Sequence, residues 1–343
     1  MRSFASDNNS GIEAEILAAI MAANVAHATP YGNDPYTEKA AELLKQTFGK
    51  SSTAYFVNNG TAANVLSLQA MVRSYNAIIC ANSAHIIVHE VGAVVNFSGC
   101  SIFAIPQQHG KITAAAIEAR YLESLQERHN NKPNVVSIAQ TTECGTVYSI
   151  DELSAIAAVC KKYKLLFHMD GCRLSNAAAA LNKSLKEITA DVGVDVLTFG
   201  GTKNGLLFGE AIIFFREDLA ADFGYIQKQG LQLNSKMRFL AAQFIPYIEK
   251  NIWLKNAGHA NLMCQRLAKG LATRKDIKFV YPVESNQLFA YFSKSIIRAT
   301  QAKFPYYILD EKTNFIRVVT SFDTSETEVD EFINLALAVK ESA

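Results

Sequence analysis

The sequence predicts an α/β fold, in which a large domain with a mostly parallel central sheet is followed by a small α+β domain. Short apolar runs alternate with helical patterns up to about Glu217, and buried strands that alternate with helices form parallel sheets covered by helices. Beyond Glu217 the pattern changes to longer helical segments and then to a few strands and helices. A chain of 343 residues is long enough for two domains. We expect the large domain over residues 1–235, with residues 1–30 contributing to its site, and the small domain over residues 236–343.

The large domain is predicted to begin with two helices before its first strand. Thr37 follows a polar loop and has the residue type of an N-cap, so we expect it to begin the second helix. The expected helices span residues 12–26, 37–48, 62–75, 91–97 and 151–163. The expected strands span residues 54–57, 77–80, 101–105, 135–140, 165–170, 194–199 and 211–215.

The small domain is predicted to follow a helical connection. The expected helical segments span residues 236–253, 257–273 and 326–339. The expected strands span residues 277–281, 287–292 and 315–320, with one further helix between the last two.

Composition excludes several classes of protein. Hydrophobic residues make up 49% and charged residues 19% of the chain, which is typical of a globular protein. A formal charge of +1 and the lack of a basic run argue against nucleic acid or an anionic membrane as a partner. The N-terminus lacks the apolar region of a secretory signal, and no apolar stretch is long enough for a membrane span. Six scattered cysteines without a CxxC pair suit reduced thiols and no metal site, so we expect a cytoplasmic protein.

Lys203 lies in a glycine-rich segment, Thr198-Phe199-Gly200-Gly201-Thr202-Lys203-Asn204-Gly205, between two apolar runs. The pattern predicts a tight turn between two buried strands. Desolvation of an unpaired ammonium favours the neutral amine, which is the form that attacks a carbonyl to give a Schiff base. The alternative is a surface lysine in a glycine turn.

Asn58-Asn59-Gly60-Thr61 lies between an expected strand and the start of an expected helix. Backbone N–H groups and the helix dipole favour an anion there, and Gly60 permits its close approach. The segment is neither a GxGxxG motif nor a Walker loop, so a dinucleotide-binding fold and a P-loop are poorly supported. An ordinary N-cap is the alternative.

Two further segments follow expected strands. His85 and Glu90 come after the strand at 77–80, where the ligand crevice of an α/β sheet lies; the His85 ring could stack on a flat ligand or be purely structural. Asp170 and Arg173 come after the strand at 165–170. They could form an ion pair with each other, or Asp170 could hold the protonated ring nitrogen of pyridoxal phosphate.

The order of these features matches the fold-type I pyridoxal phosphate enzymes, and the chain resembles the threonine aldolase / aromatic amino acid β-eliminating lyase family. Within that family it is most similar to the bacterial low-specificity L-threonine aldolases, whose central motif reads Thr-Glu-x-Gly-Thr-Val-Tyr. The resemblance covers essentially the whole chain. It rests on the segments Phe4-Ala5-Ser6-Asp7-Asn8, Tyr31-Gly32-Asn33-Asp34-Pro35, Asn59-Gly60-Thr61-Ala62-Ala63-Asn64, Ala84-His85-Ile86, His168-Met169-Asp170-Gly171-Cys172-Arg173, Gly200-Gly201-Thr202-Lys203-Asn204-Gly205, Lys236-Met237-Arg238-Phe239 and Arg317-Val318-Val319-Thr320-Ser321.

The resemblance implies a fold-type I, transferase-like architecture and a role for each matched residue. Lys203 would carry pyridoxal 5'-phosphate covalently, and Asp170 would keep its ring nitrogen protonated. The remaining cofactor contacts would come from Asn59, Gly60, Thr61, His85 and Arg173. The substrate contacts would come from Ser6, Tyr31, Arg173 and Arg317. Lys228 and Arg238 match family positions near the phosphate and could act from a neighbouring subunit.

Glu143 occupies a position where many family members have a histidine that acts on the substrate's β-hydroxyl. A carboxylate can take the same proton directly or through water. The base is therefore left open between His85 and Glu143, with His89 as a further helper.

The resemblance implies an enzyme that cleaves L-threonine, L-allo-threonine and related 3-hydroxy-α-amino acids to glycine and an aldehyde. It also implies a homodimer or homotetramer with shared sites. Two alternatives stay open at this stage. One is a pyridoxal phosphate enzyme of another type, a β-eliminating lyase or an aminotransferase. The other is a non-enzymatic α/β binding protein in which Lys203 pairs with a carboxylate.

Overall fold

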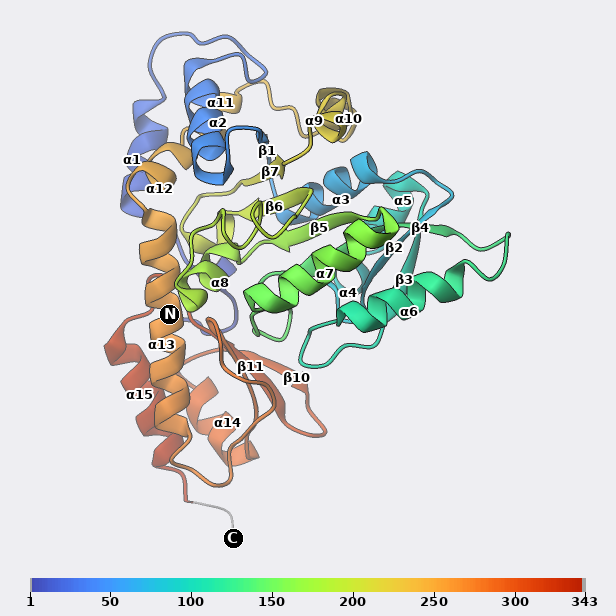
Figure 1. Cartoon of the computed structure of the whole chain (residues 1–343). Coiled ribbons are helices and arrows are strands. Elements are labelled where there is room, and N and C mark those ends of the chain that lie inside the picture. The colour runs from blue at the N-terminus through green and yellow to red at the C-terminus, as the bar shows by residue number, and fades with distance from the viewer. Residues whose placement is uncertain (1, 341–343) are drawn as a thin grey trace.

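A computed structural model of the chain, which describes residues 2–340, contains two β-sheets with helices packed on them (Figure 1). The larger sheet has seven strands in the order β1-β7-β6-β5-β4-β2-β3, and the smaller has four in the order β10-β11-β9-β8. In the larger sheet only β7 runs against its neighbours, because it pairs antiparallel with both β1 and β6. The pairs β2–β3, β2–β4, β4–β5 and β5–β6 are parallel. The predicted α/β class with a mostly parallel central sheet is therefore confirmed.

The larger sheet is formed from the strands predicted for the large domain. Its strands are β1 (Thr53–Val57), β2 (Asn76–Ala81), β3 (Ser101–Ile105), β4 (Lys132–Ala139), β5 (Leu166–Gly171), β6 (Val196–Gly200) and β7 (Glu210–Phe214). Its helices are η1 (Asp7–Asn9), α1 (Ala14–Ala22), α2 (Pro35–Phe48), α3 (Gly60–Met71), α4 (His85–Val88), α5 (Ala93–Ser98), α6 (Ala114–Ser124), α7 (Ile150–Tyr163), α8 (Leu174–Leu181), η2 (Thr202–Asn204), α9 (Glu217–Ala220) and α10 (Phe223–Gln229). In Figure 1, α6, α7 and α8 lie on one face of the sheet and α3 on the other.

The rest of the chain supplies a helical connection and the smaller sheet. The connecting helices are α11 (Met237–Ala241), α12 (Phe244–Glu249) and α13 (Ile252–Leu271). The remaining elements are β8 (Lys278–Phe279), β9 (Gln287–Tyr291), α14 (Lys294–Gln301), β10 (Tyr307–Asp310), β11 (Phe315–Val319) and α15 (Glu326–Leu337). None of the helices within residues 2–340 has the length and apolarity that crossing a bilayer requires.

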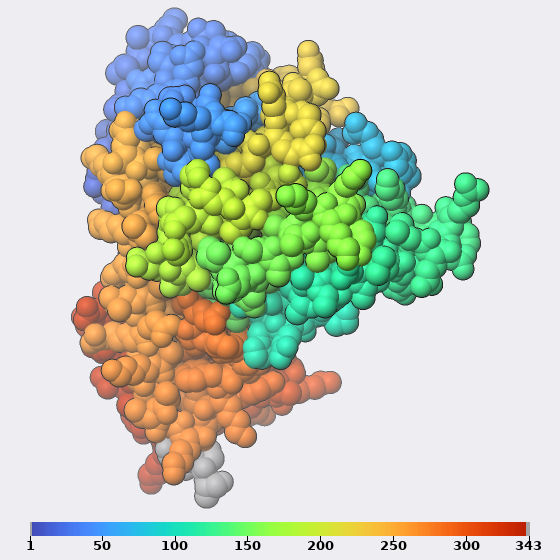
Figure 2. Space-filling view, viewed as in Figure 1, coloured from blue at the N-terminus to red at the C-terminus, as the bar shows by residue number. Residues whose placement is uncertain are grey.

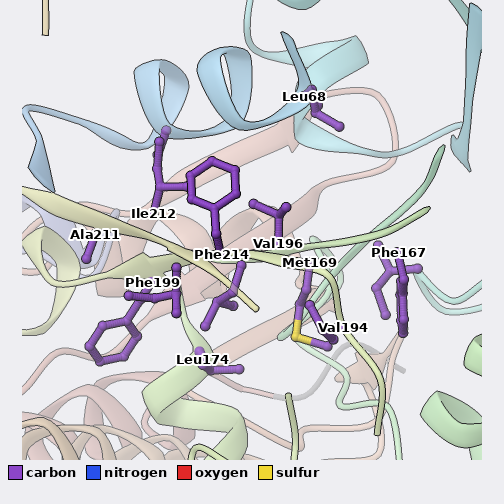
Figure 3. Close-up of a cluster of buried hydrophobic side chains, with 14 of the residues drawn as sticks. Leu68, Phe167, Met169, Leu174, Val194, Val196, Phe199, Ala211, Ile212 and Phe214 are labelled. Atoms are coloured by element: carbon purple, nitrogen blue, oxygen red, sulfur yellow. The ribbon is translucent and has the colours of Figure 1, made fainter. Parts of the chain in front are cut away.

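Two hydrophobic cores correspond to the two sheets. The first core fills the space between the larger sheet and its helices; Figure 3 shows part of it, where Leu68 of α3 and Leu174 of α8 lie near side chains of β5, β6 and β7. The second core lies between the smaller sheet, α13 and α15, and it includes Phe4 from the N-terminal segment. In the space-filling view the orange and red C-terminal residues form one end of the molecule (Figure 2). The division at residue 235 stays a prediction, although Trp253 still belongs to the first core and Met263 already to the second.

The start of α2 differs from the prediction. Asp34, not Thr37, is the N-cap, because its carboxylate accepts hydrogen bonds from the backbone N–H groups of Tyr36 (3.1 Å) and Thr37 (2.9 Å). Pro35 suits the first helical position since it has no N–H that would need a partner. The assignment of Thr37 as the cap was wrong for this reason.

The expected helix over residues 236–253 is also interrupted. Asn251 adopts a left-handed conformation with φ of 52°, which ends α12 and begins α13. A second break separates α11 from α12 at residues 242–243. The apolar spacing alone did not reveal these two breaks.

Candidate active site

A cavity of about 320 Å³ lies at the carboxyl edge of the parallel strands. Ligands of open α/β sheets bind at this edge, because the loops that follow adjacent strands diverge there. The lining residues come from η1, from the carboxyl ends of β4 and β5, from the segments after β1, β2, β4, β5 and β6, and from the start of β7. They are Asn8, Asn58, Asn59, Gly60, Thr61, His85, Ala139, Thr141, Thr142, Glu143, Asp170, Cys172, Arg173, Thr202, Lys203, Phe208 and Glu210.

Lys203 lies on η2, the short turn between β6 and β7, as the sequence predicted. The turn is attached to the connecting helices α12 and α13, because the Asn204 side chain donates to the Tyr247 hydroxyl (2.8 Å) and to the Trp253 carbonyl (2.9 Å). Lys203 is half-buried and lines the cavity. Within residues 2–340 no carboxylate oxygen lies within 4.0 Å of its ammonium, so the side chain is not committed to a structural ion pair.

The start of α3 forms one wall of the cavity. Asn59 is its N-cap, and its side-chain oxygen accepts from the backbone N–H of Ala62 (2.9 Å). A Cβ on Gly60 would lie 2.9 Å from the Sγ atom of Cys172, so no side chain fits there without displacing the sulfur. The lack of a side chain leaves the first N–H groups of the helix accessible to an anion in the cavity.

Asp170 ends β5 and points its carboxylate into the same cavity. One oxygen accepts from the Asn64 side chain (2.8 Å) and the other from the backbone N–H of Cys172 (3.0 Å). Burial acts to raise the pKa of Asp170, but these hydrogen bonds and the charge of Lys203 outweigh burial, and the pKa is lowered. The carboxylate therefore stays ionised and can face a protonated nitrogen.

Arg173 does not pair with Asp170. Its guanidinium instead forms two hydrogen bonds with Asp7, at 2.7 and 2.9 Å. Asp7 is buried and also accepts from the side chain of Asn286 (3.0 Å). Burial alone would raise the pKa of Asp7, but the Arg173 guanidinium holds it below its usual range. The sequence had left an Asp170–Arg173 ion pair open. That pair does not form, because Asp7 of the N-terminal segment binds the Arg173 guanidinium instead.

His85 and Glu143 lie together in the cavity wall. The backbone N–H of His85 donates to the Glu143 carboxylate (2.8 Å), and the His85 ring lines the cavity. Burial raises the pKa of Glu143 to about 7, against the opposing effect of hydrogen bonds to backbone N–H groups. Both candidate bases therefore have access to the cavity. His89 packs beside His85, with ring centroids 5.4 Å apart.

Arg317 lies at the side of the site near the N-terminal segment. One of its terminal nitrogens donates to the Ala5 carbonyl (3.1 Å), next to Ser6. Its Nε is buried and has no hydrogen-bond partner within residues 2–340. Burial lowers the pKa of Arg317, and the nearby charge of Arg173 acts in the same direction. A partly buried guanidinium whose Nε–H has no partner among the described residues suits a carboxylate ligand.

Five residues assigned through the family resemblance do not line the cavity within this one chain: Ser6, Tyr31, Lys228, Arg238 and Arg317. Lys228 is exposed, and its ammonium lies 5.0 Å from the centroid of the Tyr31 ring. Arg238 donates to the carbonyls of Val25 and Ala26. Ser6 also lies outside the lining, and its hydroxyl caps η1 by accepting from Asn8. The roles of these residues stay predictions.

Glu210 is a cavity residue that the sequence reading missed. It is the first residue of β7, is buried, and accepts from the backbone N–H of Gly201 at 2.7 Å. Burial raises the pKa of Glu210 to about 7, although the charge of Lys203 lowers it. A glutamate directly before an apolar strand was the available signal, because such a carboxylate is buried with its strand.

The fold and the site define an α/β protein of fold type I, in which a lysine, an ionised aspartate and the start of one helix line the same cavity. The chain belongs to the beta-eliminating lyase family, whose family model matches residues 3–295. It is 46% identical over 301 residues to a low specificity L-threonine aldolase of Pseudomonas aeruginosa, covering 88% of this chain and 87% of that one. It is 43% identical over 329 residues to a low specificity L-threonine aldolase of another Pseudomonas, covering 96% and 95%.

Solved structures agree with this assignment. A threonine aldolase of Leishmania major superposes with a TM-score of 0.93 at 30% identity, over 98% of this chain and 99% of that one. The structure of mouse CSAD superposes with a TM-score of 0.75 over 98% and 83% of the two chains, but at 14% identity it shares the fold alone.

Proposed function

We propose that the protein is a pyridoxal phosphate-dependent aldolase that cleaves L-threonine, L-allo-threonine and related 3-hydroxy-α-amino acids to glycine and an aldehyde. The observation that carries the proposal is one cavity in which Lys203, Asp170 and the start of α3 converge, in a chain whose relatives are low specificity L-threonine aldolases.

The residues of the cavity fit this cofactor. The space above Gly60, which a Cβ would fill, gives a phosphate access to the N–H groups at the start of α3. Asn59 and Thr61 flank that position. The ionised Asp170 would keep the ring nitrogen protonated, His85 would lie against the ring, and Lys203 would hold the cofactor covalently.

The cofactor would supply an electron sink for the pair left on Cα when the Cα–Cβ bond breaks. The protein's own groups then have two tasks. The Arg317 guanidinium, with Ser6 and the Asp7-bound Arg173, would hold the substrate carboxylate and so orient the bond that breaks. A base in the cavity wall, His85 or Glu143, would take the β-hydroxyl proton so that the aldehyde can form.

We also propose the setting in which the enzyme works. A small amino acid is the substrate, and neither nucleic acid nor a membrane is a partner. The exposed positions of Tyr31 and Lys228 support a homo-oligomer in which these side chains serve a neighbouring subunit. A cytoplasmic location fits six cysteines that are all free thiols.

The decisive experiment is a product assay. The protein, purified with pyridoxal phosphate, is incubated with L-threonine, and glycine and acetaldehyde are measured together. Equal amounts of the two products support the aldolase. Release of a keto acid together with ammonia, without glycine, would instead indicate β-elimination, and a keto acid without ammonia would indicate transamination. A lack of any visible cofactor absorbance would favour a binding protein.

A further inference from the structure

Glu90 is a buried carboxylate behind the cavity that the proposed reaction has not used. It follows α4, and its side chain is 0% exposed. Its Oε1 atom accepts two hydrogen bonds, from His85 Nδ1 (2.8 Å) and from the Asn64 side chain (2.9 Å). Its Oε2 atom is buried without a partner within residues 2–340. A buried carboxylate oxygen without a partner costs stability. The position of Glu90 therefore indicates a function that depends on its bonded oxygen, Oε1.

Asn64 fixes the direction of these hydrogen bonds. Its amide nitrogen donates one hydrogen to Glu90 and the other to Asp170 (2.8 Å), while its oxygen accepts from the Thr198 hydroxyl (3.1 Å). A flipped amide would place its oxygen against two carboxylate oxygens and lose the bonds to both carboxylates. Asn64 is therefore a donor to Glu90 Oε1, and that oxygen is an acceptor.

The same oxygen sets the state of the His85 ring. Because Glu90 Oε1 is an acceptor, His85 Nδ1 must donate and so carries the proton. In a neutral imidazole the other nitrogen, Nε2, is then unprotonated. Nε2 has no hydrogen bond to any residue in 2–340, and the His85 side chain is 39% exposed and lines the cavity.

We propose that Glu90 is a positioning residue that holds His85 with its proton on Nδ1, so that Nε2 faces the cavity as the proton acceptor. The role of His85 in the reaction rests on the proposed function. The O–H bond of the substrate's β-hydroxyl would break and an Nε2–H bond would form. The O–H electron pair would become part of the aldehyde carbonyl as the Cα–Cβ bond breaks and leaves its own pair on Cα, where the cofactor would serve as the electron sink. The resulting imidazolium would face the Glu90 carboxylate, which stabilises its charge. This choice makes His85 the base and leaves Glu143 to hold the His85 backbone.

The first test reads the tautomer without using activity. Solid-state ¹⁵N NMR of the histidine-labelled protein with its cofactor distinguishes a protonated from an unprotonated ring nitrogen, and a His85→Gln sample identifies the signals of His85 among seven histidines. We expect His85 to carry its proton on Nδ1. A wild-type spectrum with the proton on Nε2 would overturn the proposal, because Glu90 would then be the donor. This measurement needs no variant of Glu90, so a failure of such a variant to fold leaves the proposal testable.

The second test separates the hydrogen bond from the charge. Glu90→Ala removes the acceptor, so His85 should lose its fixed tautomer and kcat should fall by about 100-fold with KM changed less than about threefold. Glu90→Gln keeps an acceptor oxygen for Nδ1 and Asn64 but removes the charge, so it should retain the tautomer and recover part of the lost kcat.

The matched control is Glu118→Ala on the outer helix α6, where the carboxylate contacts Lys162 and Tyr163. It should change neither the tautomer nor kcat. An unchanged His85 spectrum and kcat in Glu90→Ala would overturn the proposal. A wild-type protein that cleaves no hydroxyamino acid would contradict the proposed function instead, while the tautomer measurement would still decide whether Glu90 positions His85.

Discussion

Lys203 is the residue whose replacement most directly tests the covalent attachment of the cofactor. Its turn is held by Asn204 and not by Lys203 itself, so Lys203→Ala should fold normally. We expect the variant to lose the visible absorbance of the bound cofactor and at least about 10³-fold in activity, since no other amine lines the cavity within residues 2–340. Borohydride reduction of the wild type followed by peptide mapping checks the site of attachment. An adduct on any other lysine would refute the assignment.

Arg317 is expected to set the affinity for the substrate carboxylate. Its buried Nε has no hydrogen-bond partner in the part of the chain that the structure describes, and a hydrogen bond to a charged group contributes about 1.5–3 kcal/mol. Arg317→Ala should therefore raise KM for L-threonine by about 10- to 100-fold, with the cofactor spectrum unchanged. Arg266→Ala provides the matched control, because this arginine pairs with Asp330 on the surface. A KM unchanged in Arg317→Ala would exclude the carboxylate role.

Glu210 should make the stability of the cofactor-free protein depend on pH. Burial raises its pKa from an ordinary value near 4.5 to about 7. Below pH 4.5 Glu210 holds its proton in both the folded and the unfolded chain, so its raised pKa does not change the free energy of unfolding there. Between pH 4.5 and 7 the unfolded chain releases the proton first and the folded state loses stability; above pH 7 the loss stays constant, at about 3 kcal/mol or less.

Glu210→Gln should remove this loss. We expect the variant to be more stable than the wild type at pH 8, by about 1–3 kcal/mol, and to match it near pH 4.5. Urea unfolding of both proteins at the two pH values measures the difference. Glu38→Gln, at an exposed position of α2, should show no such pH dependence. A Glu210→Gln effect of equal size at both pH values would show that the carboxylate is not protonated on folding.

At the residue scale, a site residue could be predicted where the residue type and its immediate neighbours in the sequence indicate its chemical role. The glycine turn around Lys203 and the strand end at Asp170 could be predicted, because both depend on short segments. The partners Asp7 and Asn64 could not be predicted, since each becomes a site residue only when the fold brings it beside a group from a distant segment. A buried ion pair between residues 166 positions apart has no local pattern.

The start of α3 carries a prediction at the scale of an element. Gly60→Ala would place a Cβ 2.9 Å from Cys172 Sγ, so the sulfur or the helix start must shift. We expect weaker binding of pyridoxal phosphate and a stability loss of about 1–3 kcal/mol. Adding Cys172→Ala to the same chain removes the sulfur, so the double variant should recover most of the cofactor affinity and most of the stability. Cofactor titration and thermal unfolding of the two single variants and the double variant measure this coupling. Purely additive effects would show that the contact is not the cause.

Most elements could be predicted, because the spacing of apolar residues that marks a helix or a strand can be read within one short segment. The strands from β1 to β7 lie close to their predicted ranges, and so do α2 and α7. The breaks around α11 and α12 were not predicted, since they depend on the left-handed Asn251 and on packing against the first core. β10 was also missed: its residues are half-exposed at the edge of the smaller sheet, where the apolar alternation is weak.

At the scale of the whole molecule, an oligomer would explain why predicted site residues lie on the surface. Leu17, Met21 and Val25 are spaced by four residues along and just beyond α1, and are 45%, 69% and 58% exposed. A second copy of this chain is the proposed occupant of that face, because Lys228 and Tyr31 would then complete a neighbouring site. Aromatic residues such as Tyr31 are enriched at such interfaces.

Mixing tests this arrangement. Lys203→Ala and Lys228→Ala should each be nearly inactive alone, but after joint refolding about a quarter of the wild-type activity should return in hybrid dimers, because half of the chains pair as hybrids and each hybrid has one intact site. Light scattering at the assay concentration gives the oligomeric state. A fully active monomer, or no recovery on mixing, would contradict the shared site.

The N-terminal segment has a consequence for how the protein is made. The backbone N–H of Phe4 donates to Pro305, and the Phe4 carbonyl accepts from Val319, each at 2.8 Å. At about 5–20 residues per second on the ribosome, these partners emerge roughly 15–60 s after Phe4 itself. The two hydrogen bonds of Phe4 can form only after Pro305 and Val319 have left the ribosome. The N-terminal segment, although it is synthesised first, therefore reaches its final place beside the smaller sheet only near the end of synthesis.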